Sequence, residues 1–273
     1  MSNSLDLFEL REKELKILRN FDSFCKEKDI PYFLSNGTLL GAVKYGGFIP
    51  WDDDIDVVLL REDYDRFINE YFDSRYILFE TRKNNRFRYP FAKLSDPDTV
   101  LNETDVNNGV NLGVNIDIFP LDYINLDFKN AKKLSLKLHN ASMLLLYSKR
   151  KIRYKKELGF KQNAIDIFYG ICSKVIPPRL YVKYIQKKAQ MFKGEKKSKY
   201  LAMLCWSVYK GREVMPAEVY EKTVKVSFEG EEYPAPVGYD KYLRNLYGDY
   251  EKDPPKEKQK THHFFKAYNK KDI

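Results

Sequence analysis

Four aspartates stand immediately before an apolar run: Asp52, Asp53, Asp54 and Asp56. The run itself, from Val57 to Leu60, is typical of a strand that enters a hydrophobic core. Side chains alternate between the two faces of a strand, so the sequence predicts Asp52, Asp54 and Asp56 on one face. Asp53 then turns away from them. A solvated acidic turn after Pro50 is the alternative interpretation.

Carboxylates two residues apart on an apolar strand suggest a metal site. They repel each other and resist ionising together unless a cation lies between them. Oxygen ligands of this kind suit Mg²⁺ or Mn²⁺, ions that also bind substrate phosphates. The sequence therefore predicts a magnesium or manganese site at these aspartates.

Asp117 is a second acid within an apolar strand, in the sequence Asn-Ile-Asp-Ile-Phe. A buried acid needs a partner, so we interpret Asp117 as a third carboxylate at the same metal or as a general base. The alternative is a structural aspartate at a strand end that pairs with a lysine or caps a turn.

The dipeptide Gly37-Thr38 lies between a predicted strand at 30–35 and a short predicted helix at 38–45, which Gly46-Gly47 would end. The free N–H groups and the dipole of a helix N-terminus attract phosphate. Neither a Walker loop nor a Gly-x-Gly-x-x-Gly fingerprint is present. The position of Gly37-Thr38, one helix before the acidic strand, predicts phosphate contacts beside the metal ligands.

Periodicity along the chain predicts an α/β (α+β) fold. The first 25 residues or so have the apolar spacing of an amphipathic helix, and a helix over 61–72 should follow the acidic strand. Shorter strands are expected at 76–80, 89–94, 99–102 and 114–119, the last closed by Pro120. Residues 127–210 have a helical pattern, and strands near 224–228 and a helix near 240–247 complete the chain.

The net charge of +9 is unevenly distributed. Residues 129–199 contain 20 Lys or Arg and three Asp or Glu, so this segment carries +17 and the rest of the chain −8. A nucleic-acid-binding protein should surround its functional site with positive charge, so we expect no nucleic-acid partner. Three widely spaced cysteines and the absence of a signal peptide or long apolar span predict a cytoplasmic protein.

Residues 37–56, Gly-Thr-Leu-Leu-Gly-Ala-Val-Lys-Tyr-Gly-Gly-Phe-Ile-Pro-Trp-Asp-Asp-Asp-Ile-Asp, resemble the LicD family of phosphocholine transferases within the nucleotidyltransferase superfamily. Three further segments support the resemblance: Phe91–Asp98, Asn115–Asp122 and the C-terminal FEGEEYPAPVGYDKYLRNLYGDY. One departure is Lys44-Tyr45, where the family often has a basic residue followed by histidine.

The resemblance implies a single catalytic domain over residues 1–273. It would comprise a nucleotidyltransferase-like mixed sheet at 1–125, a basic helical segment at 126–215 and a C-terminal cap at 216–273. It also implies transfer of phosphocholine, or of the alditol phosphates of fukutin-related proteins, from a CDP-linked donor such as CDP-choline. The acceptor would be a sugar hydroxyl of a teichoic-acid, capsule or lipopolysaccharide precursor, and CMP would be released.

Site roles follow from the same resemblance. Asp54 and Asp56 become the metal ligands, with Asp52 as an added acid and Asp117 as the third carboxylate and base. Lys93, His262 and His263 are candidate phosphate contacts, although a surface lysine and a terminal histidine pair are the alternatives. A choline donor would require an aromatic cage, for which Trp51 is the candidate.

The apolar stretch Ala164–Ile176 has basic flanks, a pattern that can hold a protein at an anionic membrane near a lipid-linked acceptor. An ordinary core helix with solvated lysines is the alternative.

Two rival functions also stay open: a nucleotidyltransferase that attaches a nucleotide monophosphate to a small acceptor, and a basic RNA-binding or scaffold protein.

Overall fold

The computed structural model describes residues 4–103, 106–154, 159–195, 198–261 and 265–272. The α-helices in these ranges are α1 (Leu7–Glu27), α2 (Asn36–Tyr45), α3 (Arg61–Glu70), α4 (Phe128–Lys149), α5 (Phe160–Lys174), α6 (Pro178–Ala189) and α7 (Tyr239–Tyr247). Short 3-10 turns lie at Gln190–Phe192, Leu204–Trp206, Ala217–Tyr220, Lys256–Lys258 and Lys270–Asp272.

The strands of the main sheet are β1 (Phe33–Leu34), β2 (Asp56–Leu60), β3 (Ile77–Phe79), β4 (Ala92–Ser95), β6 (Asn115–Ile124), β7 (Tyr200–Ala202) and β8 (Met215–Pro216). Their order is β1-β2-β6-β4-β3, with β7 pairing with the far end of β6 and β8 with β7. Only β2 and β6 are parallel among these pairs. Two small sheets pair β9 (Thr223–Phe228) with β10 (Glu231–Pro236), and β5 (Thr99–Glu103) with β11 (Phe265–Asn269).

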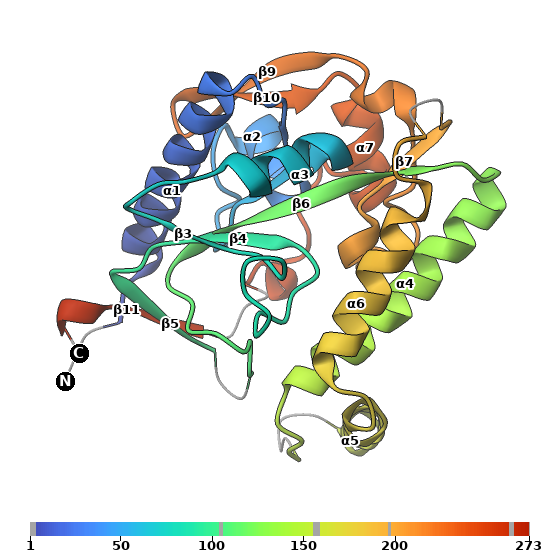
Figure 1. Cartoon of the computed structure of the whole chain (residues 1–273). Coiled ribbons are helices and arrows are strands. Elements are labelled where there is room, and N and C mark those ends of the chain that lie inside the picture. The colour runs from blue at the N-terminus through green and yellow to red at the C-terminus, as the bar shows by residue number, and fades with distance from the viewer. Residues whose placement is uncertain (1–3, 104–105, 155–158, 196–197, 262–264, 273) are drawn as a thin grey trace.

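This mixture of strand directions confirms the predicted α+β class. β6 runs through the middle of the molecule, with α1 and α3 beside it, and α2 packs against β2 (Figure 1). The core contains fully buried side chains from the sheet and from α1, among them Ile118, Val57 and Phe21. A capping box fixes the start of α1, because Asp6 accepts from the Glu9 backbone N–H and Glu9 accepts in return from that of Asp6.

The basic helices form a separate layer. α4 and α6 run side by side, and α5 lies across their end, away from β7 (Figure 1). β7 returns to the main sheet after α6, so the helical segment is tied to the core sheet at that point. None of the helices in the described ranges combines the length and the apolarity that a bilayer crossing requires.

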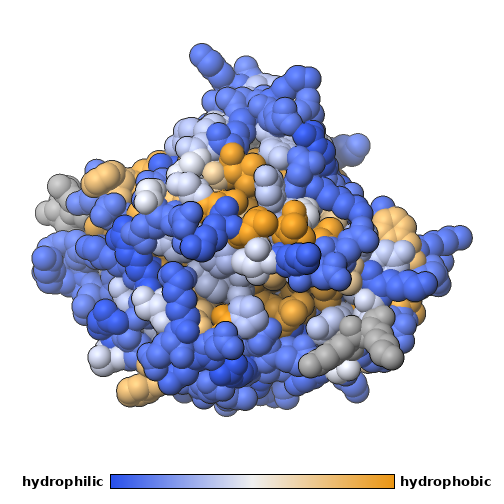
Figure 2. Space-filling model, turned by 90° about the horizontal axis from the view of Figure 1, so that it is seen from above, coloured by the Kyte–Doolittle hydropathy of each residue, from blue (hydrophilic) through white to orange (hydrophobic). Residues whose placement is uncertain are grey.

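The face seen from above, over β9, β10 and α7, is hydrophilic around its edge, with apolar residues gathered near its middle (Figure 2). The chain ends meet on another side of the molecule, where the Leu5 N–H donates to the Ala267 carbonyl in β11 at 2.8 Å. β11 therefore holds the start of the chain beside α1.

Three local predictions were wrong. The strand after Pro50 begins only at Asp56, so Asp52 to Asp54 do not alternate across a sheet. α2 begins at Asn36 and not at Thr38, so Gly37 lies in its first turn and not between a strand and the helix. Pro120 does not close β6. The pairing with β4 ends at Ile118 and the pairing with β7 begins at Asp122, so Pro120 lies between the two and its missing N–H interrupts neither.

Candidate active site

Three charged side chains form a row across adjacent strands. Asp56 on β2 is the register partner of Asp117 on β6, and Asp117 is the partner of Lys93 on β4. Residues directly opposite each other project from the same face of a sheet. The Lys93 ammonium forms an ion pair with Asp117 and donates to Asn115 Oδ1 at 3.1 Å. The sheet thus unites three of the predicted residues.

Asp56 is buried and held by two contacts from α2. Its Oδ2 accepts from Asn36 Nδ2 at 3.0 Å, and its backbone N–H donates to Thr38 Oγ1 at 2.8 Å. Asn36 is fixed in turn by Tyr242 of α7, whose hydroxyl donates to Asn36 Oδ1 at 3.0 Å and accepts from the Asn36 N–H at 3.3 Å. Asn36 has φ +46°, a left-handed conformation that asparagine tolerates better than most residues. These contacts specify where the Asp56 carboxylate points.

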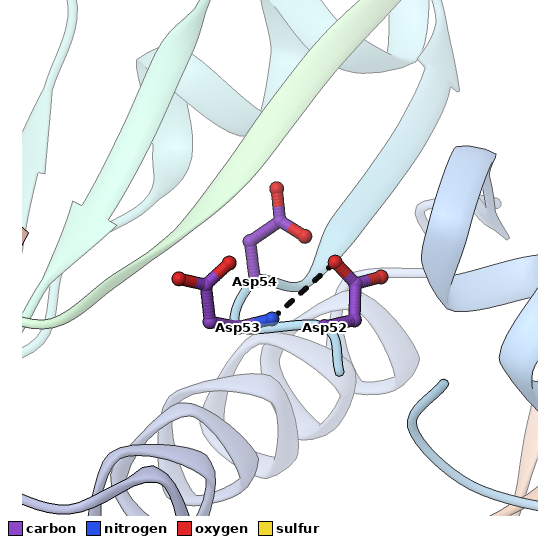
Figure 3. Close-up of side chains that lie close together, drawn as sticks. All are labelled: Asp52, Asp53 and Asp54. Atoms are coloured by element: carbon purple, nitrogen blue, oxygen red, sulfur yellow. Dashed lines mark hydrogen bonds between the residues drawn. The ribbon is translucent and has the colours of Figure 1, made fainter. Parts of the chain in front are cut away.

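Asp52, Asp53 and Asp54 lie just before β2 and form the acidic cluster of the site. Each offers a carboxylate oxygen, and these oxygens lie within 4.8 Å of one another. Figure 3 shows the three carboxylates on one side of the backbone, with the Asp53 N–H donating to Asp52 Oδ1 at 3.3 Å. The prediction that Asp53 turns away was wrong, because this segment is not an extended strand.

Arg11 holds the backbone of the acidic cluster, and Gly37 leaves room for the Asp52 carboxylate. Arg11 of α1 donates to the Asp52 carbonyl at 2.7 and 3.1 Å and to the Ile49 carbonyl at 2.8 Å. Gly37 approaches so closely that a Cβ there would lie 2.5 Å from Asp52 Oδ2. A side chain at position 37 would therefore displace the Asp52 carboxylate.

Glu14 of α1 is an additional acid that the sequence prediction missed. Its side chain is buried, and among the described residues its Oε2 has no hydrogen-bond partner. Burial raises the pKa of Glu14 well above its usual value, and the negative charges of Asp54, Asp53 and Asp52 raise it further. The signal was present in the sequence: Glu14 occupies the apolar face of α1, between Leu10 and Leu18.

The site can hold a divalent cation. Its donors are all carboxylate oxygens, the type that Mg²⁺ and Mn²⁺ prefer. The acidic cluster and Glu14 also concentrate negative charge, because the cluster raises the pKa of Glu14 and the positive charge of Arg11 lowers it by less. The residues present therefore fit the predicted metal, with Asp53 brought close to Asp52 and Asp54.

Three of the predicted phosphate and choline contacts, Gly37, Thr38 and Trp51, lie beside this cluster or beside Asp56. Gly37 and Thr38 are in the first turn of α2, whose N-cap residue Ser35 makes no capping hydrogen bond with its side chain. Trp51 is half-buried, packs edge-on against Tyr45 with ring centroids 6.5 Å apart, and lines a pocket of about 450 Å³ together with Asp53. His262 and His263 lie outside the described residues.

Two further groups near the row were not predicted. Lys149, at the end of α4, is buried with its Nζ 3.2 Å from the centre of the Tyr89 ring, and burial lowers its pKa well below the usual value. Lys93 lies over the same ring at 4.9 Å.

Tyr209 is the second group. Its hydroxyl is hydrogen-bonded to that of Tyr247 at 2.8 Å, and its pKa is raised by burial and then by the charges of Asp56 and Asp54. The lysines therefore lie on the β4 side of the row, and the Tyr209 hydroxyl lies near its acidic end.

Comparison with known proteins gives a match along nearly the whole chain. The lipopolysaccharide cholinephosphotransferase LicD of Haemophilus influenzae is 32% identical over 273 residues, which cover 95% of this chain and 97% of the relative. The chain belongs to the LicD family. Residues 29–143 of this LicD family member match the family described as "LicD/FKTN/FKRP, nucleotidyltransferase domain", and that range includes the acidic cluster and the row.

Two other relatives share parts of the LicD family chain. Mannosyltransferase regulator 4 of Saccharomyces cerevisiae is 34% identical over 124 residues, which are 40% of this chain and 10% of the yeast protein. An uncharacterized protein of Rickettsia prowazekii is 38% identical over 48 residues, 18% of each chain. The predicted resemblance to the LicD family is confirmed.

Proposed function

We propose that this LicD family member transfers phosphocholine, or a related alditol phosphate, from a CDP-linked donor to a sugar hydroxyl. The acceptor is a precursor of a teichoic acid, a capsule or a lipopolysaccharide, and CMP is released. The main support is the acidic cluster beside the Asp56–Asp117–Lys93 row. Membership of the family makes the chain a phosphotransferase, and the Haemophilus relative is by name a lipopolysaccharide cholinephosphotransferase.

The cation of the proposed site is Mg²⁺ or Mn²⁺. Asp52 and Asp54 are proposed as ligands because they belong both to the acidic cluster and to the set that the family resemblance implies. Proximity favours Asp53 as the next carboxylate, and the resemblance favours Asp56 and Asp117. When bound, such an ion neutralises charge on a diphosphate.

The first turn of α2 is the proposed contact for the donor diphosphate. Backbone N–H groups at a helix N-terminus bind anions, and the missing Ser35 cap leaves that end of α2 to another acceptor. In the transfer, the acceptor hydroxyl oxygen forms a bond to the phosphorus that carries choline. The bond from that phosphorus to the bridging oxygen breaks, and the electron pair leaves with CMP.

Asp117 is the proposed acceptor of the hydroxyl proton. It lies between Asp56 and Lys93 in the row, and Lys93 holds its carboxylate through the ion pair. Lys93 also brings a positive charge to the transferring phosphoryl group. The proton leaves the sugar oxygen as the new phosphorus–oxygen bond forms.

Trp51 is the proposed contact for choline. Trp51 and Asp53 both line the 450 Å³ pocket, and an aromatic side chain together with a carboxylate attracts a quaternary ammonium group. Loss of one cation–π contact costs roughly 0.5 to 2 kcal/mol, which corresponds to a rise of about two- to thirtyfold in KM for CDP-choline. Trp51→Ala should produce this rise and leave KM for CDP-glycerol unchanged, because glycerol carries no positive charge.

The deciding experiment uses CDP-choline labelled in the choline group, Mg²⁺ and a lipopolysaccharide or teichoic-acid acceptor. We expect labelled glycan and free CMP in equal amounts. A nucleotidyltransferase would instead leave CMP on the acceptor and release phosphocholine, which would overturn the proposal.

The cation is tested with single carboxylate-to-amide variants. Asp54→Asn should lower the rate by more than about 100-fold with the thermal unfolding curve retained, since even orienting partners of metal ligands are worth 10- to 100-fold. The activity of Asp53→Asn and of Asp56→Asn is then titrated with Mg²⁺. The variant that needs the higher Mg²⁺ concentration identifies the further ligand. Full turnover in excess chelator would contradict the metal proposal.

A further inference from the structure

Helix α5 presents its apolar residues to solvent. Phe160 is 83% exposed, Phe168 63%, Ile171 59% and Val175 80%. The buried residues of the helix are instead Asn163, Gly170 and Ser173. At about 100° per residue, the exposed apolar side chains occupy one half of the helix circumference and the buried small or polar ones the other half. This is the reverse of an ordinary surface helix, which buries its apolar stripe.

Polar contacts hold α5 in this orientation. Lys174 donates to the carbonyls of Ser148 and Arg150 at 2.6 and 2.9 Å, and Tyr147 donates to Asp166 at 3.0 Å. The rings of Tyr147 and Tyr169 stack with their centroids 5.6 Å apart. Because these contacts fix the inner face against the end of α4, the outer apolar face stays available to another surface.

Residues next to α5 in the chain also expose apolar side chains. Ile152 and Tyr154 before the helix are 42% and 60% exposed, and Ile176 and Leu180 after it are 41% and 45% exposed. Single exposed apolar residues are common on proteins, but several on one face of a single helix mark an interaction site. The position of α5 at the outer end of α4 and α6 leaves this face unobstructed by the main sheet (Figure 1).

The charge around this face identifies its partner. α5 lies in the segment 129–199, which carries +17, and exposed lysines and arginines such as Lys151, Lys161 and Arg179 lie along the chain near the apolar residues. A basic protein surface would repel a second copy of itself. An apolar helix face among basic residues matches the interface of an anionic bilayer, where acyl chains take the apolar side chains and headgroups take the cations.

We propose that the outer face of α5 docks this protein on an anionic membrane. Phe160, Phe168, Ile171 and Val175 enter the boundary between headgroups and acyl chains, and the surrounding lysines and arginines contact lipid phosphates. Docking would bring the protein to acceptors that are linked to lipid. The docking itself does not depend on which group the active site transfers.

The test is flotation of the full chain with vesicles of phosphatidylcholine containing about one-third phosphatidylglycerol, at low salt and without any CDP donor. We expect the wild-type chain to bind, to bind vesicles of phosphatidylcholine alone much more weakly, and to be released by 1 M salt, where the Debye length is only about 3 Å. The double variant Phe168→Gln/Ile171→Gln should bind the anionic vesicles at least about tenfold more weakly.

Phe72→Gln is the matched control, because Phe72 is 86% exposed but lies outside the basic segment. It should bind as the wild type does, and all variants should keep the wild-type unfolding curve. Absence of wild-type binding at low salt, or equal binding by the double variant, would overturn the proposal. A third result would also overturn it: the wild-type chain is a dimer that does not bind vesicles, and the double variant is a monomer. A second copy of the chain would then cover α5. Because no transfer is measured, failure of the activity assay leaves this result unaffected.

Discussion

Removal of the Tyr242 hydroxyl tests how the site positions Asp56. Tyr242→Phe deletes one buried oxygen, and with it both hydrogen bonds to Asn36. The N–H and the Oδ1 of Asn36 lose a partner in a buried place, where an unsatisfied group costs roughly 1 to 3 kcal/mol. We expect the free energy of unfolding to fall by about that amount. Asn36 then loses the contact that holds its amide toward Asp56.

Activity should fall in a specific way. Loss of a partner that orients a ligating carboxylate costs about 10- to 100-fold, and Tyr242 acts one residue further away, so we expect about a tenfold lower kcat. KM for the CDP donor should rise as well, because the Asn36 N–H that Tyr242 binds belongs to the first turn of α2, the proposed diphosphate contact. Steady-state kinetics at saturating Mg²⁺ with urea unfolding of the same preparations measures both effects.

Tyr250→Phe provides the control for Tyr242→Phe. Tyr250 follows α7, and its hydroxyl donates to Asp240 at 2.8 Å, remote from Asn36 in the hydrogen-bond network. Its removal should leave kcat unchanged. If Tyr242→Phe kept the wild-type kcat, or if both variants lost kcat equally, the reasoning from Tyr242 through Asn36 to Asp56 would be refuted.

Two further predictions concern buried charges. Asp122→Ala should lower the free energy of unfolding by about 3 to 5 kcal/mol in urea titrations, because it leaves the buried Arg61, now bound at 2.7 and 3.0 Å, without its partner. Glu14→Gln should stabilise metal-free protein at pH 7 to 8. A carboxyl whose pKa is raised on folding lowers stability at every pH above its ordinary pKa, because the unfolded chain then releases the proton more readily. The gain should therefore vanish as the pH falls below the ordinary pKa of 4.5. An equal gain at all pH values would contradict the role of ionisation.

The sequence predicts the elements that bring the site together but not their detailed contacts. α1, α2, α3 and the buried strand β2 follow from apolar spacing and from Gly46, which ends α2 with φ +68°. Asp117 and Lys93 were predicted as site residues, yet their alignment with Asp56 depends on a sheet register that pairs segments distant in sequence. Alternation failed at Asp52 to Asp54 because the turn after Ile49, closed by the Asp52 N–H at 2.9 Å, keeps these residues out of the strand.

Helix α5 shows a different limit of sequence reasoning. The composition of Ala164–Ile176 predicts an apolar helix, but composition cannot say which side of that helix meets the protein. Contacts from Tyr147 and Lys174 decide this, and both depend on how α4 packs beside α5. The same apolar pattern therefore fits both a core helix and an exposed helix, and only the position of α4 distinguishes the two.

The order of charges across the sheet suggests how a CDP-linked donor would be oriented. The acidic cluster before β2 forms the negative end of the site, whereas Lys93 and Lys149 share the Tyr89 ring near β4 at the other end. A diphosphate is repelled by the first end unless a cation binds there, and it is attracted by Lys93 at the second. Asp117 lies between the two ends, paired to Lys93 on one side and beside Asp56 on the other. In the proposed transfer, an acceptor hydroxyl that approaches Asp117 would meet the diphosphate between the cation site and Lys93, with Asp117 beside it to accept the proton.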